Sequence, residues 1–186
     1  MRRKASDVLT ALFFTVAMLA TSYFSFGIWT TFIFSFGFLG GFVLWLFFPG
    51  VTAYSLLKGP YYLTLASFLF LHKVEENIAK FQERLSEITG HPVPAINSPA
   101  LIVLLFLTVG GWLLVPFLIK RRYQFGYYLA WSFFASMGIV ELAHFIFPFF
   151  IEGPYGYFPG MASVFVLAPA AWWGMWRLVR YRYGEQ

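Results

Sequence analysis

Histidine and glutamate residues at helical spacing form two groups in this chain, and they are the residues best able to do chemistry. The first group is His72, Glu75 and Glu76, at positions i, i+3 and i+4, so the three side chains share one helix face. The second group is Glu141 and His144, three positions apart inside an apolar run. Imidazole nitrogens and carboxylate oxygens can ligate a metal ion or share a proton. Both groups are therefore candidates for metal binding or acid–base chemistry.

Each group also has a purely structural interpretation. Glu83 and Glu87 continue the acidic stripe of the first group, as on the solvated face of an amphipathic interfacial helix. In the second group, a buried pair of Glu141 and His144 could serve only to fix the packing of helices. Ionisable groups at membrane depth are costly, so each of these residues needs either a partner or a function, and both interpretations stay open.

The composition is that of an integral membrane protein. Of the 186 residues, 60% are hydrophobic and only 11% are charged, whereas roughly 25% of the residues in a soluble domain are charged. Such a chain could not cover the surface of a soluble globule. The composition therefore excludes a soluble domain, a disordered chain and a nucleic-acid-binding module, despite the net charge of +5. Cysteine is absent, which excludes disulfides and thiolate ligands.

The apolar runs predict the elements that must position the two groups. A helix needs about 20 apolar residues to cross the hydrocarbon region, and Gly27, Pro49-Gly50 and Pro60 divide the long N-terminal run. Pro60 is expected to begin a helix, so the third span could be full, broken or re-entrant. We predict an all-α, polytopic membrane helix bundle, one transmembrane domain over residues 1–186. Its approximately six spans are 7–26, 28–48, 51–72, 100–119, 125–150 and 161–179.

The polar stretch 73–99 is predicted to extend the third span as an amphipathic helix to about Thr89, followed by a Pro-rich loop. At 100° per residue, one face of this helix is an apolar seam, made of Leu71, Val74, Ile78, Phe81, Leu85 and Ile88. The basic residues Lys73, Lys80 and Arg84 are predicted to lie on another face and to point away from His72.

The positions of the basic residues predict the orientation, since Lys and Arg accumulate on the cytoplasmic side. With six spans and both termini cytoplasmic, the inner side carries ten of the 13 basic residues, namely Arg2, Arg3, Lys4, Lys58, Lys120, Arg121, Arg122, Arg177, Arg180 and Arg182. His72 and the pair of Glu141 and His144 then fall in the outer half of their spans. We therefore expect His72 and His144 to lie within about 10 Å of each other, as a shared metal requires.

A third motif, Tyr157-x-Pro159-Gly160, follows the two groups. Together with His72-x-x-Glu75-Glu76 and the second histidine, His144, it resembles the HXXEE-motif family of small integral membrane proteins. The resemblance covers the chain from the third span to the start of the sixth. It implies an enzymatic activity, without a defined substrate, in which these motif residues take part.

The leading hypothesis is a metal-dependent membrane enzyme, a hydrolase or oxidoreductase, that acts on a hydrophobic or lipid-like substrate among membrane lipids. The candidate ligands suit one or two ions of zinc, iron or manganese, and they are His72, Glu75, Glu76, Glu141 and His144. With one zinc on His72, Glu76 and His144, either Glu75 or Glu141 would be the catalytic base.

Two alternatives remain open. His72 and Glu76 look like the acid pair of the emopamil-binding-like sterol isomerases, which predicts a metal-free acid–base lipid isomerase. The other alternative is a non-catalytic subunit or a proton-coupled transporter, in which buried Glu–His pairs relay protons. Metal content separates the leading hypothesis from both.

Overall fold

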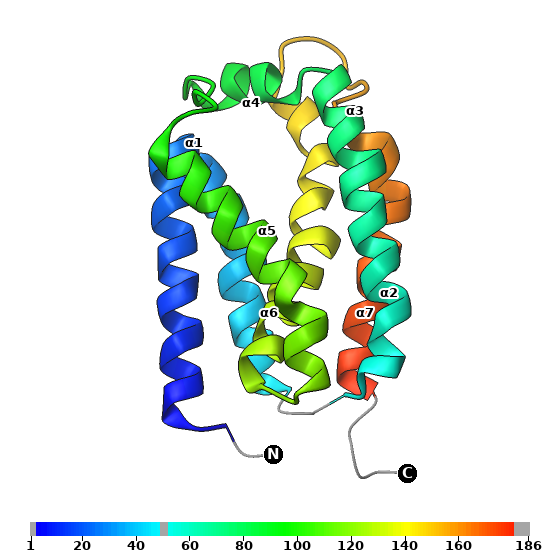
Figure 1. Cartoon of the computed structure of the whole chain (residues 1–186). Coiled ribbons are helices and arrows are strands. Elements are labelled where there is room, and N and C mark those ends of the chain that lie inside the picture. Colours follow the sequence, from blue (N-terminus) through cyan, green and yellow to red (C-terminus); the bar gives the residue numbers. More distant parts are fainter. Residues whose placement is uncertain (1–2, 49–51, 181–186) are drawn as a thin grey trace.

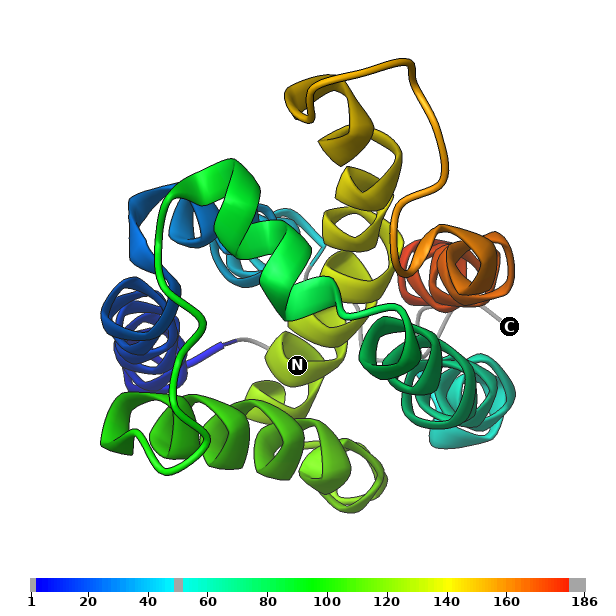
Figure 2. The ribbon, with the colours of Figure 1, turned by 90° about the horizontal axis from the view of Figure 1, so that it is seen from above.

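The N-terminal hairpin is the first feature of the computed structural model, which describes residues 3–48 and 52–180 (Figure 1). Helix α1 (Ala5–Phe47) is sharply kinked at Gly27, whose φ of 74° and ψ of −175° leave the helical region. The two halves run side by side in opposite directions (Figures 1 and 2). Each half has about 20 residues, the length that crosses a bilayer. The predicted division at Gly27 is confirmed, whereas Pro49-Gly50 lies outside the described residues.

The third predicted span is a composite helix. Helix α2 (Tyr54–Ala66) continues without a break into a π-helical segment (Ser67–His72) and then into α3 (Lys73–Ile78). Pro60 lies inside α2, so the prediction that it begins a helix is wrong. Proline is tolerated inside apolar helices because neighbouring elements satisfy the backbone group that it leaves free. The π segment is notable because such wide turns occur mostly as short insertions, frequently at functional sites, and this one ends at His72.

The predicted apolar seam along residues 71–88 is also wrong. Lys80 adopts the left-handed conformation with a φ of 57°, and this turn separates α3 from α4 (Phe81–Thr89). Upstream of the turn, Val74 and Ile78 point outward and are exposed, whereas downstream Leu85 is buried against Phe147 and Phe158. Figure 2 shows that α4 crosses the end of the bundle instead of extending α3.

The second half of the chain surrounds a buried central helix. Helix α5 (Pro99–Lys120) agrees with the fourth predicted span, and α7 (Met161–Arg180) agrees with the sixth. Between them, α6 (Gln124–Gly138) is buried on all sides and contacts α1, α5 and α7. The fifth predicted span is α-helical only as far as Gly138, because the chain then forms 3₁₀ helices over Val140–Phe145 and Phe147–Phe150.

The regular elements of the described residues are all helices, with no strand among them, which confirms the all-α class. Three helices, α1, α5 and α7, are long and apolar enough to cross a membrane. Large apolar side chains cover their outer surfaces; Phe13, Phe106 and Phe165, for example, are each more than 70% exposed. Such a surface is stable only in an apolar solvent. The start of α1 and the end of α7 lie at one end of the bundle, while α4 lies at the other (Figure 1).

Candidate metal centre

Four of the predicted site residues converge at the end of the bundle that α4 covers. His72 closes the π segment and Glu76 lies one turn later in α3, whereas Glu141 and His144 belong to the 3₁₀ helix Val140–Phe145. A 3₁₀ helix has three residues per turn, so the side chains of Glu141 and His144 stand directly above each other. The rings of His72 and His144 are 4.9 Å apart between centroids. The predicted approach of these two histidines, 72 positions apart in the chain, is confirmed.

The four ligand atoms alternate around a common centre. Glu141 Oε2 lies 3.0 Å from His72 Nε2 and 3.1 Å from His144 Nε2. Glu76 Oε1 lies 3.2 Å and 3.5 Å from the same two nitrogens. Zinc bonds of about 2.0–2.2 Å in tetrahedral geometry place neighbouring ligand atoms about 3.3 Å apart. Since all four atoms lie within 4.8 Å of one another, the group has the dimensions for a single ion.

Outer hydrogen bonds fix the orientation of both imidazole rings. His144 Nδ1 is 2.5 Å from the Pro159 carbonyl oxygen, and because a carbonyl only accepts, this nitrogen must carry the hydrogen. His72 Nδ1 is 2.8 Å from Ser163 Oγ, which in turn donates to the Gly160 carbonyl at 3.1 Å. A serine hydroxyl whose hydrogen is used in this way accepts from His72 Nδ1–H. Both histidines are therefore held in the arrangement typical of metal ligands, with Nε2 facing inward.

The two Nε2 atoms and the two carboxylate oxygens that face one another include no hydrogen-bond donor when both histidines carry their hydrogen on Nδ1. In neutral histidines with Nδ1–H, both Nε2 atoms present lone pairs toward two carboxylate oxygens. His72 Nε2 is buried and has no hydrogen-bond partner among the described residues. Lone pairs and carboxylates at such distances repel unless a cation, either a metal ion or protons on the imidazoles, lies between them. The donor set of two imidazoles and two carboxylates suits zinc, iron or manganese.

The Tyr157-x-Pro159-Gly160 motif surrounds this group. Pro159 supplies the carbonyl for His144, and Gly160, with a φ of 96°, turns the chain directly against both rings. A Cβ atom at Gly160 would lie 3.0 Å from His72 Cε1 and closer still to the His144 ring. Only glycine combines this backbone conformation with such close approach. Pro159 and Gly160 of the motif thus form a wall against the two histidines, whereas the Tyr157 hydroxyl binds Glu75.

Glu75 does not join the four candidate ligands. Its Oε1 accepts hydrogen bonds from the Tyr157 hydroxyl at 2.6 Å and the Ala162 backbone N–H at 3.0 Å, and its Oε2 accepts from the Ser163 backbone N–H at 2.7 Å. These three hydrogen bonds favour the ionised form of the Glu75 carboxyl. The carboxylate lies at the N-terminus of α7, where the helix dipole favours a negative charge. Glu75 thus connects α3 to α7.

Lys73 does not lie where its helical spacing predicts. Its ammonium does not point away from the group, but donates a hydrogen bond to Glu76 Oε2 and lies 5.1 Å from the centroid of the Phe68 ring. The i, i+3 spacing of Lys73 and Glu76 could have indicated this contact, because the flexible lysine stem reaches a neighbour on the adjoining helix face.

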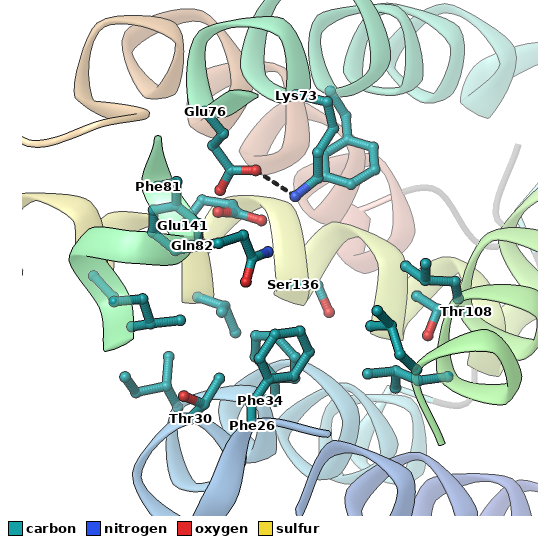
Figure 3. Close-up of a pocket in the computed structure, with 18 of the residues that line it drawn as sticks. Phe26, Thr30, Phe34, Lys73, Glu76, Phe81, Gln82, Thr108, Ser136 and Glu141 are labelled. Atoms are coloured by element: carbon teal, nitrogen blue, oxygen red, sulfur yellow. Dashed lines mark hydrogen bonds and ion pairs between the residues drawn. The ribbon is translucent and has the colours of Figure 1, made fainter. Parts of the chain in front are cut away.

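Three of the four candidate ligands, Glu76, Glu141 and His144, border a mainly apolar cavity. The cavity has a volume of about 430 Å³, within the range of small-molecule sites. Lys73, Glu76, Glu141 and His144 line one region, and Figure 3 shows Glu76 and Glu141 beside the neutral Gln82. Aromatic and aliphatic side chains form most of the remaining wall, among them Phe26, Phe34, Phe38, Phe68, Leu101, Leu104, Val109, Trp112 and Phe147.

Comparisons with known proteins returned no relative. No family model matches the chain, and neither the curated proteins nor the solved structures contain a match.

Proposed function

We propose that this chain is a multi-pass membrane enzyme in which His72, Glu76, Glu141 and His144 bind one divalent ion of zinc, iron or manganese. The observation that carries the proposal is the pair of Nε2 atoms held inward by Pro159 and Ser163, with two carboxylate oxygens 3.0–3.5 Å away. A bound divalent ion supplies Lewis acidity toward a substrate oxygen or activates water. Hydrolysis and oxidation are the reaction types that this ligand set supports.

The substrate in this proposal is lipid-like and enters from the surrounding membrane lipids. The mainly apolar cavity supports it, because apolar walls with a few converging polar groups are typical of sites for hydrophobic ligands. Glu76 and Glu141 line the cavity as well as facing the histidines. The candidate base is whichever of Glu76 and Glu141 keeps a free oxygen lone pair when the ion is bound. Glu75 is a positioning residue, because its oxygens already accept hydrogen bonds.

The proposed topology has six spans with both termini cytoplasmic. The two halves of α1, the composite helix from α2 to α3, α5, α6 with its 3₁₀ extension, and α7 supply the six passes. The HXXEE-motif family is the proposed family, and its support is the arrangement of the motif residues. His72 and Glu76 face His144, while Glu75, Tyr157, Pro159 and Gly160 hold the surrounding backbone.

A metal-free isomerase is the second candidate, because the same N–O distances of 3.0 and 3.1 Å at Glu141 would suit hydrogen bonds from protonated imidazoles. Elemental analysis of the purified protein decides between the two. We expect roughly one equivalent of a transition metal per chain. Protein that carries no metal after purification and does not bind zinc, iron or manganese when these are added would contradict the metal enzyme and favour the isomerase.

Glutamine substitutions test the ligand assignment. Glu76→Gln and Glu141→Gln should each lower metal occupancy by about tenfold or more, because a neutral amide is a poor ligand and one negative charge is lost. Glu83→Gln is the matched control, since the Glu83 side chain is exposed on α4 and is not among the four residues. Equal and negligible effects of all three substitutions on metal content would refute the assignment.

A further inference from the structure

The cavity contains a cation that the four-residue metal group does not require. Lys73 is the first residue of α3, and its half-exposed side chain is part of the lining of the cavity. The ammonium is held between Glu76 Oε2 and the face of the Phe68 ring, 5.1 Å from its centroid. Figure 3 shows Lys73 and Glu76 on the same wall, with Glu141 nearby.

The balance of charge at this wall is the second observation. The ionisable residues lining the cavity within the described ranges are Lys73, Glu76, Glu141 and His144. His144 is neutral when its Nε2 lone pair faces an ion, so the two carboxylates are opposed by one ammonium and one divalent ion. One positive charge is left over. Uncompensated charge beside apolar surface is costly, and an anion bound at this wall would reduce that cost.

The remaining wall of the cavity restricts what the anion can be attached to. Away from the charged end, the polar lining residues are neutral, for example Thr30, Gln82, Thr108 and Ser136. Aromatic rings and aliphatic side chains make up the rest, with Phe26, Phe34 and Phe38 from α1 facing Leu104 and Trp112 from α5. This wall offers no second cation for a doubly anionic ligand and little to hydrate a large polar body.

We propose that the cavity binds an amphiphile with one singly charged anionic head group, a carboxylate or a phosphodiester, and that Lys73 binds this head group. The apolar body lies against the aromatic wall, and the head group lies between the Lys73 ammonium and the proposed ion. The inference deepens the proposed function and rests on it, because without the divalent ion the surplus positive charge does not exist. Lys73 is then a specificity-determining residue for a charged head group over a neutral one.

The test measures binding of brominated amphiphiles to the purified, metal-loaded protein in detergent. The probes are a fatty acid, an alkyl methyl phosphate and a fatty alcohol with the same brominated chain. Bromine quenches tryptophan fluorescence on contact, and Trp112 lines the cavity, so Trp112→Phe identifies the signal from this site. Metal content is determined on every sample. We expect at least one anionic probe to bind about tenfold or more tightly than the alcohol, and the acid and the phosphate identify the head group.

The variants separate a direct role of Lys73 from an indirect one. Lys73→Met should abolish the preference for the anionic probe while metal content is kept, and Lys73→Arg should retain the preference. Lys58→Met is the control, since Lys58 is exposed on α2, away from the cavity. Equal binding of the acid, the phosphate and the alcohol by metal-loaded wild type would overturn the inference and leave the metal site intact.

Two further results would also count against the inference. Loss of metal in Lys73→Met together with loss of the preference would show that Lys73 acts only by holding Glu76, and would overturn its role in binding the head group. Absence of metal from the wild type, measured independently of the probes, would overturn the proposed function itself and this inference with it.

Discussion

At the scale of single residues, the orientation of His72 and His144 depends on groups outside the ligand set. The Pro159 carbonyl and the Ser163 hydroxyl hold the two Nδ1 atoms, and Gly160 lets the backbone that carries them approach the rings. Such outer contacts set the direction of the lone pair that a metal ion would use. The candidate centre therefore includes the segment 159–163 as much as the four side chains that face one another.

Gly160→Ala is the sharpest test of this arrangement. The added methyl group would meet the rings of both histidines, so we expect a loss of metal occupancy and a destabilisation of about 2–4 kcal/mol from overpacking and backbone strain together. Gly153→Ala is the matched control: Gly153 also has a positive φ, 118°, but its Cβ position has no neighbour within 4 Å. It should lose only about 1 kcal/mol through strain. Thermal unfolding in detergent and metal analysis measure both effects, and equal losses in the two variants would contradict the proposed wall.

At the scale of elements, Glu75 connects α3 to the first turn of α7. Its carboxylate accepts hydrogen bonds from Tyr157, Ala162 and Ser163. Tyr157 precedes the segment 159–163, which orients His72 and His144, and the other two donors belong to that segment. The connection explains how two elements far apart in sequence keep the histidines at a fixed separation. Its loss should loosen the packing of α3 on α7 while the four candidate ligands remain chemically unchanged.

Glu75→Gln should therefore destabilise the protein by about 1–3 kcal/mol, because an amide cannot accept all three hydrogen bonds at once. Tyr157→Phe should cost about 0.5–1.5 kcal/mol, and the two changes should be non-additive because they remove the same contact. Metal content should stay close to that of the wild type at moderate temperature. Glu87→Gln is the control, since its exposed ion pair with Arg84 contributes little. Loss of metal in Glu75→Gln without loss of stability would instead identify Glu75 as a ligand.

The helices around the site were predictable only where one regular period continued. Residues 99–120 and 161–180 are uninterrupted apolar helices with recognisable starts, and the predicted bounds agree closely with α5 and α7. The kink at Gly27 was also predictable, because glycine tolerates a φ of 74°. In contrast, the π segment Ser67–His72 and the 3₁₀ helix Val140–Phe145 contain the same kinds of residue as the α-helices around them. Tertiary packing determines their wider and tighter turns, and no local signal in the sequence distinguishes them.

The candidate site was predictable to a similar extent. The i, i+4 pair of His72 and Glu76 and the i, i+3 pair of Glu141 and His144 indicated the four side chains that converge. The structure separates Glu75 from them because its carboxylate turns toward the N-terminus of α7, a neighbour that helical periodicity cannot specify. The position of the Lys73 ammonium was predicted wrongly, because helical spacing gives only the direction of the Cβ atom. The long, flexible lysine side chain can carry its charge to a neighbouring face.

At the scale of the whole molecule, the two ends of the bundle differ in charge. The start of α1, the start of α2, the end of α5 and the end of α7 lie together (Figure 1), and they carry Lys4, Lys58, Lys120, Arg177 and Arg180. The end that holds the candidate site carries Lys73, Lys80 and Arg84 together with Glu75, Glu76, Glu83 and Glu87. The positive-inside rule therefore predicts that the basic end is cytoplasmic, as in the proposed topology, and that the site faces the opposite side of the membrane.

Single cysteines can test this orientation, because the natural chain has none. Glu152→Cys places a thiol on the exposed segment at the site end, and Lys58→Cys places one at the basic end. In intact cells, a membrane-impermeant maleimide should label Glu152→Cys and leave Lys58→Cys unlabelled. After the membrane is opened, both variants should react to a similar extent, and the wild type should not react in either condition. The reverse pattern would place the site on the cytoplasmic side, and labelling of both thiols in intact cells would contradict a bundle that spans the membrane with its two ends on opposite sides.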